Sequence, residues 1–179
     1  VWSGLRARKG RTWAAPNAWA LAFSCLYLAW SVAAQQQVRT VAEKALAAQG
    51  IHNAQLWVYA SPFNTVLWRV LAVTPTHSHE GFYSLLDKDE HISLTATERG
   101  QDYLERWADV PHVQRMLRFT QGPVRMEVVD GRVLLTDLRM GQEPSYSFVF
   151  DLGTPAQLDA GTVDTVRRVS TPISAAFDG

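Results

Sequence analysis

The chain has 179 residues and a formal net charge of zero, and 47% of its residues are hydrophobic. All 17 acidic residues lie beyond residue 42, whereas four of the 17 basic residues lie within the first 11. The mildly acidic main part has no basic stripe, which argues against nucleic acid as a partner. The single cysteine, Cys25, excludes an intrachain disulfide and a Cys-x-x-Cys metal site.

An uncharged apolar run occupies residues 14–34, directly after a short basic segment over residues 1–13. A run of this length can cross the hydrocarbon layer of a bilayer as one helix, and flanking basic residues stay on the cytoplasmic side. We therefore predict a cytoplasmic segment over 1–13, a transmembrane helix over 14–34 and an extracytoplasmic domain after it. Trp13 and Trp30 lie where the two membrane interfaces would be.

Two other interpretations of this run remain open. A buried helix of a soluble protein is the less favoured, because such helices rarely run this long without a charge. A secretory signal is the stronger alternative, since the small residues at 31–34 before Gln35 are typical of a cleavage site. Both the signal and the anchor place the following domain outside the cytoplasm.

The helical pattern continues beyond the run. Residues 35–49 carry apolar side chains at the spacing of an amphipathic helix, and Gly50 can end that helix in a left-handed conformation. The span and this second helix are expected to form one rod. The chain begins with Val1 rather than Met, and we expect it to be part of a longer protein.

From residue 55 onwards the pattern changes to the period of two that is typical of strands. Two short helices interrupt the strands, and we expect Asp109 to cap the second of them, with Pro111 in its first turn. Asp130-Gly131 is a strong signal for a two-residue hairpin turn. The predicted strands cover 55–60, 66–73, 79–86, 91–95, 124–129, 132–138 and 145–151, and the predicted helices cover 98–107 and 111–119.

This order of strands, helices and strands predicts an α+β domain over residues 35–152 with a mainly antiparallel sheet and two inserted helices. Residues 153–179 show no sustained period, and we expect them to form a loose C-terminal tail.

One spacing resembles a metal site. His77 and His79 would point to the same side of a strand, with His91 across a turn. The two residues fall at the predicted hairpin tip over 74–78, where polar residues are ordinary, so we favour a surface turn over a metal site.

Four polar residues lie within or beside apolar strands, namely Asn64, Arg69, Asp137 and Arg139. They are the candidate catalytic residues. The more ordinary interpretation, which we favour, is a structural salt bridge of Asp137 with Arg69 or Arg139. The sequence contains no nucleophile elbow, no dinucleotide-binding glycine motif and no P-loop.

Four stretches together resemble a known family. They are Ser-Pro-Phe-Asn-Thr-Val-Leu-Trp-Arg at 61–69, Glu-Gly-Phe-Tyr-Ser-Leu-Leu-Asp at 80–87, Asp-Leu-Arg-Met-Gly at 137–141 and Pro-Ser-Tyr-Ser-Phe at 144–148. With the preceding apolar run, they are similar to the C-terminal part of the bacterial membrane-bound metal-dependent hydrolases, a family of LexA-regulated inner-membrane proteins. The resemblance covers residues 14–151.

The resemblance implies a bacterial inner-membrane protein with several membrane helices, of which this chain holds the last. Its partners would be the lipid bilayer and the N-terminal membrane helices that precede this chain. The family's divalent metal would be held by His and Asp motifs in that N-terminal half, including a His-Arg-Gly-x-Thr-His-Ser-like stretch. This sequence contains none of these motifs, so we expect the chain itself not to bind the metal and to be inactive alone.

In the intact protein we expect Asn64, Arg69, Asp137 and Arg139 to lie near a sheet edge that faces the bilayer, where they would complete the site. The alternative is a non-catalytic, envelope-anchored module for binding or assembly. A third interpretation is a secreted domain released after signal cleavage.

Overall fold

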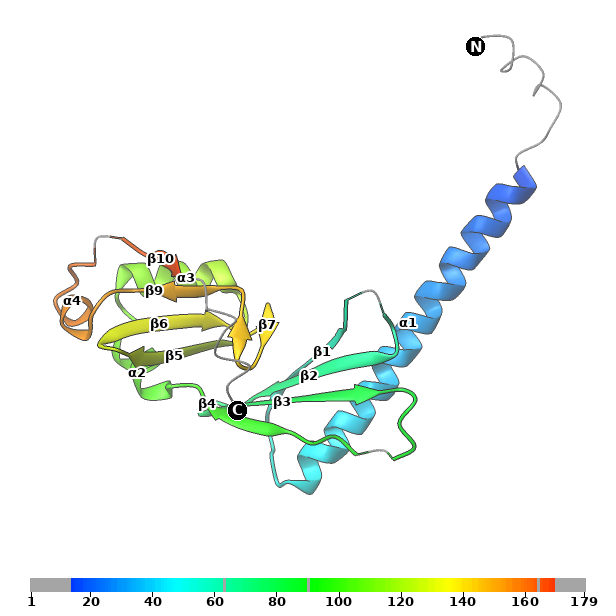
Figure 1. The fold of residues 1–179 in the computed structure, drawn as a ribbon, viewed down its shortest axis with the longest axis horizontal. Helices are drawn as coiled ribbons and strands as arrows, with labels where there is room; N and C mark the ends of the chain where they lie inside the picture. The colour runs from blue at the N-terminus through cyan, green and yellow to red at the C-terminus, as the bar shows by residue number, and fades with distance from the viewer. Residues whose placement is uncertain (1–13, 63, 90, 164, 170–179) are drawn as a thin grey trace, which may run out of the picture.

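A long helix and two four-stranded antiparallel sheets make up the protein (Figure 1). The computed structural model describes residues 14–62, 64–89, 91–163 and 165–169, so the predicted basic segment and Trp13 lie outside the described residues. The predicted α+β class is confirmed, with the strands divided between these two sheets and a separate two-stranded sheet of β7 and β8. In chain order the elements are α1 (Ala14–Ala48), β1 (Gln55–Ala60), β2 (Leu67–Val73), β3 (His77–Ser84), β4 (Thr95–Glu98), α2 (Gln101–Arg106), α3 (Pro111–Thr120), β5 (Val124–Val129), β6 (Arg132–Asp137), β7 (Gly141–Gln142), β8 (Ser145–Tyr146), β9 (Val149–Asp151), α4 (Pro155–Asp159) and β10 (Arg167–Val169).

Helix α1 is a single rod of 35 residues, as the continuous helical pattern predicts. It ends at Ala48, and the chain turns away at Gly50, whose φ of 69° is left-handed; the Ile51 N–H donates to the Leu46 carbonyl at 2.9 Å. It is the one helix among the described residues that is long and apolar enough to span a membrane, a test that a signal sequence also passes.

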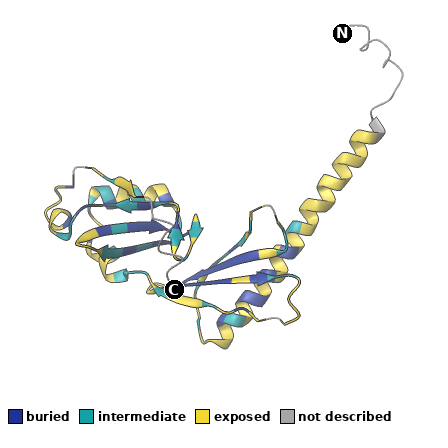
Figure 2. Ribbon diagram, viewed as in Figure 1, coloured by how far each residue is buried: buried dark blue, intermediate teal, exposed yellow. Residues whose placement is uncertain are grey.

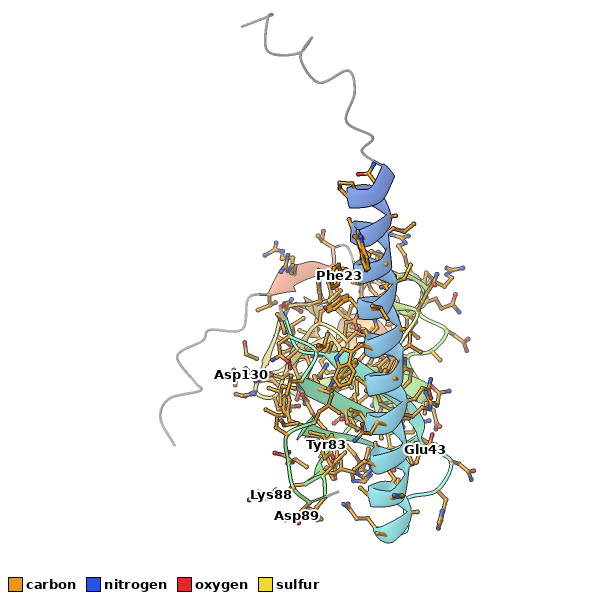
Figure 3. All side chains as sticks on the ribbon, turned by 90° about the vertical axis from the view of Figure 1, so that its right-hand side faces the viewer. Phe23, Glu43, Tyr83, Lys88, Asp89 and Asp130 are labelled. Atoms are coloured by element: carbon orange, nitrogen blue, oxygen red, sulfur yellow. The ribbon has the colours of Figure 1, made fainter. Side chains whose placement is uncertain are left out.

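The two halves of α1 have different surroundings. Side chains over residues 16–33 are exposed, apart from the half-buried Ser31, and this part of α1 extends away from both sheets (Figure 2). It includes Phe23, an exposed residue that is labelled in Figure 3. From Ala34 onwards one stripe is buried, at the i, i+3, i+4 spacing that the sequence shows. This stripe consists of Ala34, Val38, Val41, Ala42 and Leu46.

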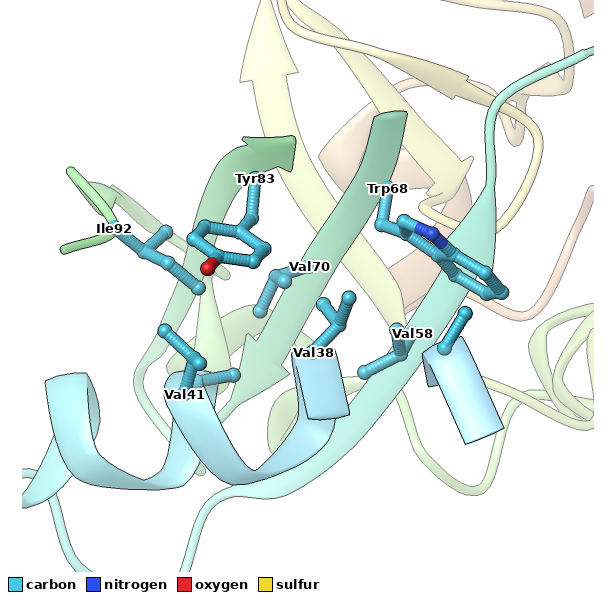
Figure 4. Close-up of a cluster of buried hydrophobic side chains, with 9 residues drawn as sticks. Val38, Val41, Val58, Trp68, Val70, Tyr83 and Ile92 are labelled. Atoms are coloured by element: carbon cyan, nitrogen blue, oxygen red, sulfur yellow. The ribbon is translucent and has the colours of Figure 1, made fainter. Parts of the chain in front are cut away.

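Sheet A has the strand order β1-β2-β3-β4. The second half of α1 covers one face, where Val38 and Val41 pack against Val70 and Tyr83 (Figure 4). Burial of these apolar side chains fixes the helix to the sheet. Trp68 is buried in the same cluster.

The β2–β3 hairpin is tighter than predicted. The Thr74 hydroxyl accepts a hydrogen bond from the His77 N–H at 3.0 Å, and the Thr74 N–H donates to the His77 carbonyl at 2.9 Å. Strand β3 therefore begins at His77, which corrects the predicted start at residue 79. Strand β4 covers Thr95–Glu98 instead of the predicted 91–95.

Sheet B has the order β10-β9-β6-β5 and is covered by α2, α3 and α4 (Figure 1). The predicted turn between β5 and β6 is confirmed, because Asp130 and Gly131 have φ angles of 49° and 71°. The predicted cap is wrong: Val110, not Asp109, holds the N-cap position of α3, and no side chain caps it.

Residues 153–163 and 165–169 are parts of sheet B and its cover, which differs from the predicted loose tail. A capping box between Thr154 and Gln157 starts α4, and Leu158 and Val163 are buried in the core. Helix α4 and strand β10 are too short to produce a visible period in the sequence, so packing alone reveals them. Residues 170–179 of that tail lie outside the described residues.

Besides the buried cluster on each sheet, a third cluster of buried apolar side chains joins the two sheets. Leu71 and Val73, on the face of sheet A that points away from α1, pack with Leu138, Tyr146 and Val149. Sheet A is thus covered by α1 on one face and by residues of the second half of the chain on the other. This arrangement places the polar residues discussed below between the two sheets.

Candidate functional site

A buried ion pair lies at the junction between the sheets. The Arg69 Nε donates to Glu80 Oε1 at 2.6 Å, and both side chains are only 8% exposed. The second carboxylate oxygen of Glu80 accepts from the Tyr146 hydroxyl at 3.0 Å. The Arg69 Nη2 donates to the Leu138 carbonyl at 3.0 Å, and Nη1 donates to the Arg139 carbonyl at 3.5 Å.

Asp137 and Arg139 form the second pair. Asp137 Oδ2 accepts from Arg139 Nη2 at 2.6 Å, and Oδ1 accepts from the backbone N–H of Arg139 at 3.0 Å. These hydrogen bonds raise the pKa of the Arg139 guanidinium above its ordinary value. The predicted structural salt bridge of Asp137 with Arg139 is therefore confirmed, whereas Arg69 pairs with Glu80 instead.

Tyr146 connects these residues to a third pair. Its ring lies 6.0 Å from the Arg69 guanidinium carbon and 5.5 Å from that of Arg125, and Arg125 pairs with Glu143. Burial, then the charges of Glu80 and Glu143, raise the pKa of the Tyr146 hydroxyl well above its ordinary value. The hydroxyl therefore stays protonated and serves as a donor. The Nε of Arg125 is the one buried side-chain polar atom without a partner in the described part of the chain.

We call Arg69, Glu80, Asp137, Arg139 and Tyr146 the polar network. Both oxygens of each carboxylate in it accept hydrogen bonds. Such closed networks hold structure in place, because removing one member leaves another buried and unpaired. The geometry therefore suits orientation of the two sheets better than proton transfer.

The remaining predicted residue, Asn64, lies outside the polar network. Its side-chain oxygen accepts from the N–H groups of Val66 and Leu67 at 2.7 and 2.8 Å, which closes the turn that precedes β2. Asn64 thus acts within its own turn, while Arg69, Asp137 and Arg139 come together.

The histidines do not form a metal centre. The rings of His77 and His79 lie 6.2 Å apart, and burial, followed by the nearby His77, lowers the pKa of His79. No group of three His, Cys, Asp or Glu side chains in the described ranges could hold a metal ion.

Sequence reasoning missed Glu80 and Tyr146. A signal for Glu80 exists, because the tight turn after Thr74 pairs Leu71 with Glu80 in the β2–β3 ladder. Leu71 lies two residues after Arg69 on β2, so this register places Glu80 on the same face of sheet A as Arg69. Tyr146 could not be found in this way, since it comes from a distant part of the chain.

A cleft of about 490 Å³ lies beside the junction, between the start of β1, the β2–β3 turn and the loop that follows α3. Its lining comprises Asn53, Gln55, Trp57, Val73, Thr74, Pro75, Arg99, Gln121, Gly122 and Pro123. The stem of Arg139 packs against Gly122: a Cβ added at this glycine would lie 2.7 Å from Arg139 Cδ. The cleft and the polar network are therefore adjacent.

The stretches 61–69, 80–87, 137–141 and 144–148 meet in the polar network, since each of them supplies at least one member. No protein-family model, no curated protein and no solved structure matches the chain.

Proposed function

We propose that this chain is the membrane-anchored, extracytoplasmic C-terminal domain of a bacterial inner-membrane metal-dependent hydrolase. The exposed first half of α1 carries the anchoring part of this proposal. Residues 16–33 are uncharged and, apart from Ser31, exposed, and 18 helical residues extend about 27 Å. This length is close to the roughly 30 Å of a bilayer's hydrocarbon core.

The packing of α1 favours a retained anchor over a cleaved signal. Ala34, at the potential cleavage site, is 2% exposed and lies in the core of sheet A. The next residue, Gln35, donates from its side chain to the Val58 carbonyl at 3.1 Å. A continuous, packed helix is a poor substrate for a peptidase that needs an accessible site.

The hydrolase part of the proposal rests on the resemblance of the four stretches, which supply the polar network. In this proposal the metal and the reacting groups belong to the preceding membrane helices, because the described residues of this chain do not fit a metal ion. The polar network fixes sheet B against sheet A and thereby the position of the whole domain on its anchor.

Labelling of cysteines tests the anchor and the side of the membrane. Cys25, midway along the exposed half of α1, should resist a membrane-impermeant maleimide in intact cells and react only after detergent is added. Asp89→Cys in a Cys25→Ser background places a thiol on an exposed loop and should react without detergent. Protection of this thiol in intact cells would contradict an extracytoplasmic domain, and a mature protein that starts near Gln35 would contradict the anchor.

Activity of the complete protein tests the hydrolase assignment. The full reading frame that contains this chain should hydrolyse at least one substrate from a panel of esters, amides and phosphoesters. A chelator should abolish this hydrolysis, and a divalent metal should restore it. A complete reading frame without metal-dependent hydrolysis would contradict the assignment.

A second candidate is the non-catalytic, anchored binding or assembly module. The cleft beside the junction favours it, because this concave site is lined by amides and one guanidinium and has no acid or base suited to proton transfer at neutral pH. Binding of a ligand or partner that persists in the presence of a chelator would support this candidate.

A further inference from the structure

Arg99 is a half-buried cation that has no acidic partner among the described residues. Its Nε donates to the Val124 carbonyl at 3.0 Å, and its Nη1 donates to the carbonyls of Thr74 and Pro75 at 2.7 and 3.3 Å. No Asp or Glu in the described part of the chain forms an ion pair with it. The cleft beside the junction thus holds a positive charge whose hydrogen-bond partners, in the part of the chain that the structure describes, are backbone carbonyls.

The other lining residues add no charge of either sign. Asn53, Gln55 and Gln121 contribute exposed amides, and Trp57 contributes a half-buried indole. Amide N–H groups and a guanidinium are donors that recognise a carboxylate, while an indole offers a flat apolar surface. The cleft therefore combines an anion-binding end with an aromatic wall.

We propose that this cleft binds a small organic carboxylate with a planar apolar part, with the carboxylate directed at Arg99 and the planar part against Trp57. The volume of about 490 Å³ is within the range of ligand sites for small molecules. No acidic side chain in the described ranges pairs with Arg99, and a bound carboxylate would neutralise its charge in a partly dehydrated site.

This site is independent of the proposed hydrolase function, because every lining residue belongs to this chain and none is a candidate metal ligand. Its test therefore measures binding and not activity. A failure of the hydrolase assignment leaves the site intact, and a failure of the site leaves the hydrolase assignment untouched.

The test is a titration of the full chain in detergent micelles with sodium benzoate, followed by NMR of the tryptophan indole N–H groups. The Trp57→Phe variant identifies the Trp57 signal. Benzoate should shift this signal in a saturable way, and the shift should weaken as salt screens the charge. Benzamide has the same shape without the charge and should bind at least several-fold more weakly.

A negative charge introduced at the rim distinguishes binding in the cleft from general surface binding. Gln55 is exposed, and its side chain makes no hydrogen bond with any described residue. Gln55→Glu therefore adds a negative charge on a side chain of nearly the same size, and it removes no hydrogen bond within the described part of the chain. It should weaken benzoate binding on the order of tenfold. The matched control, Gln114→Glu on the exposed face of α3, should leave binding unchanged.

Arg99 itself is a poorer target, because its hydrogen bonds join the β2–β3 turn to β5 and its loss would disturb the fold. Three results would overturn the proposal: a Trp57 shift that does not saturate, benzamide binding as tight as that of benzoate, or unchanged benzoate binding in the Gln55→Glu variant.

Discussion

Arg69 and Glu80 are buried charges, and the contribution of each to the stability of the fold depends on the other. Each is 8% exposed and has lost most of its hydration, a cost that the ion pair and its further hydrogen bonds offset. The exposed pair of Arg39 and Glu43 on α1, at 48% and 58% exposure, gains little from the same attraction because water screens it. Burial thus decides which of these two salt bridges contributes measurably to the stability of the fold.

Arg69→Met should destabilise the full chain in micelles by about 3–5 kcal/mol, because Glu80 would stay buried without its cation. Urea unfolding followed by circular dichroism measures this change. Arg39→Met breaks the exposed pair and should cost less than about 0.5 kcal/mol. A double Arg69→Met, Glu80→Leu variant should recover part of the loss, and equal effects of the two single variants would contradict the role of burial.

His79 gives the stability of the fold a pH dependence. Its pKa in the folded chain lies below the usual 6.5 because burial, and then His77, disfavour the imidazolium. On acidification the unfolded chain takes up this proton first, so the contribution of His79 is complete above the unfolded pKa and is lost as pH falls towards the folded pKa.

The midpoint of thermal unfolding should therefore fall less in His79→Gln than in the wild-type chain between about pH 7.5 and pH 5.5. Differential scanning calorimetry at both pH values measures the difference. His52→Gln changes an exposed histidine and serves as the control. An unchanged pH dependence in His79→Gln would show that other groups are responsible.

Helix α1 is one element with two environments. Its first half exposes apolar side chains to the surroundings, and its second half buries a stripe against sheet A. Because the helix is continuous, any orientation that the bilayer gives the first half is transmitted to the folded domain.

A charge introduced into the exposed half of α1 should therefore weaken membrane insertion, whereas a charge in the packed half should not. Leu26→Arg places a guanidinium near the middle of residues 16–33 and should raise the free energy of insertion by about 2.5–3.5 kcal/mol. The fraction of the chain that resists alkaline extraction from membranes should drop accordingly. Ala47→Arg, at an exposed position near the other end of α1, should leave this fraction unchanged; a similar loss in both variants would contradict the span.

At the scale of the whole molecule, the two sheets are joined by apolar and polar contacts together. Leu71 is fully buried and packs with Leu138 and Val149 from the second half of the chain. Arg99 adds hydrogen bonds to the β2–β3 turn and to β5. A junction of this kind predicts that sheets A and B unfold as one unit.

Leu71→Ala should destabilise both sheets by about 2–5 kcal/mol while the transition remains single. Hydrogen exchange at the amides of Val58 in sheet A and Val133 in sheet B should report equal losses of protection. Leu86→Ala, at a side chain that is 79% exposed, should change stability by less than about 0.5 kcal/mol. A loss confined to Val58 would show that the sheets are independent.

The elements that could be predicted from the sequence are those whose signals are local. The apolar run and the stripe that follows it predicted α1, and strands β1 and β5 appear with the predicted bounds. The Asp130-Gly131 turn and the pair of Asp137 with Arg139, two residues apart, were also predictable. In each case the determining groups lie within a few residues of one another or repeat at a fixed period.

Contacts between segments that are distant in the sequence became visible in the folded structure alone. It showed where α1 stops being exposed, because Ala34 is the first residue of α1 that sheet A buries. It also paired Arg69 with Glu80 and brought Tyr146 to them, and it placed Arg99 in a cleft between segments that are far apart in the chain. These contacts depend on how the two sheets pack, which leaves no periodic signal in the sequence.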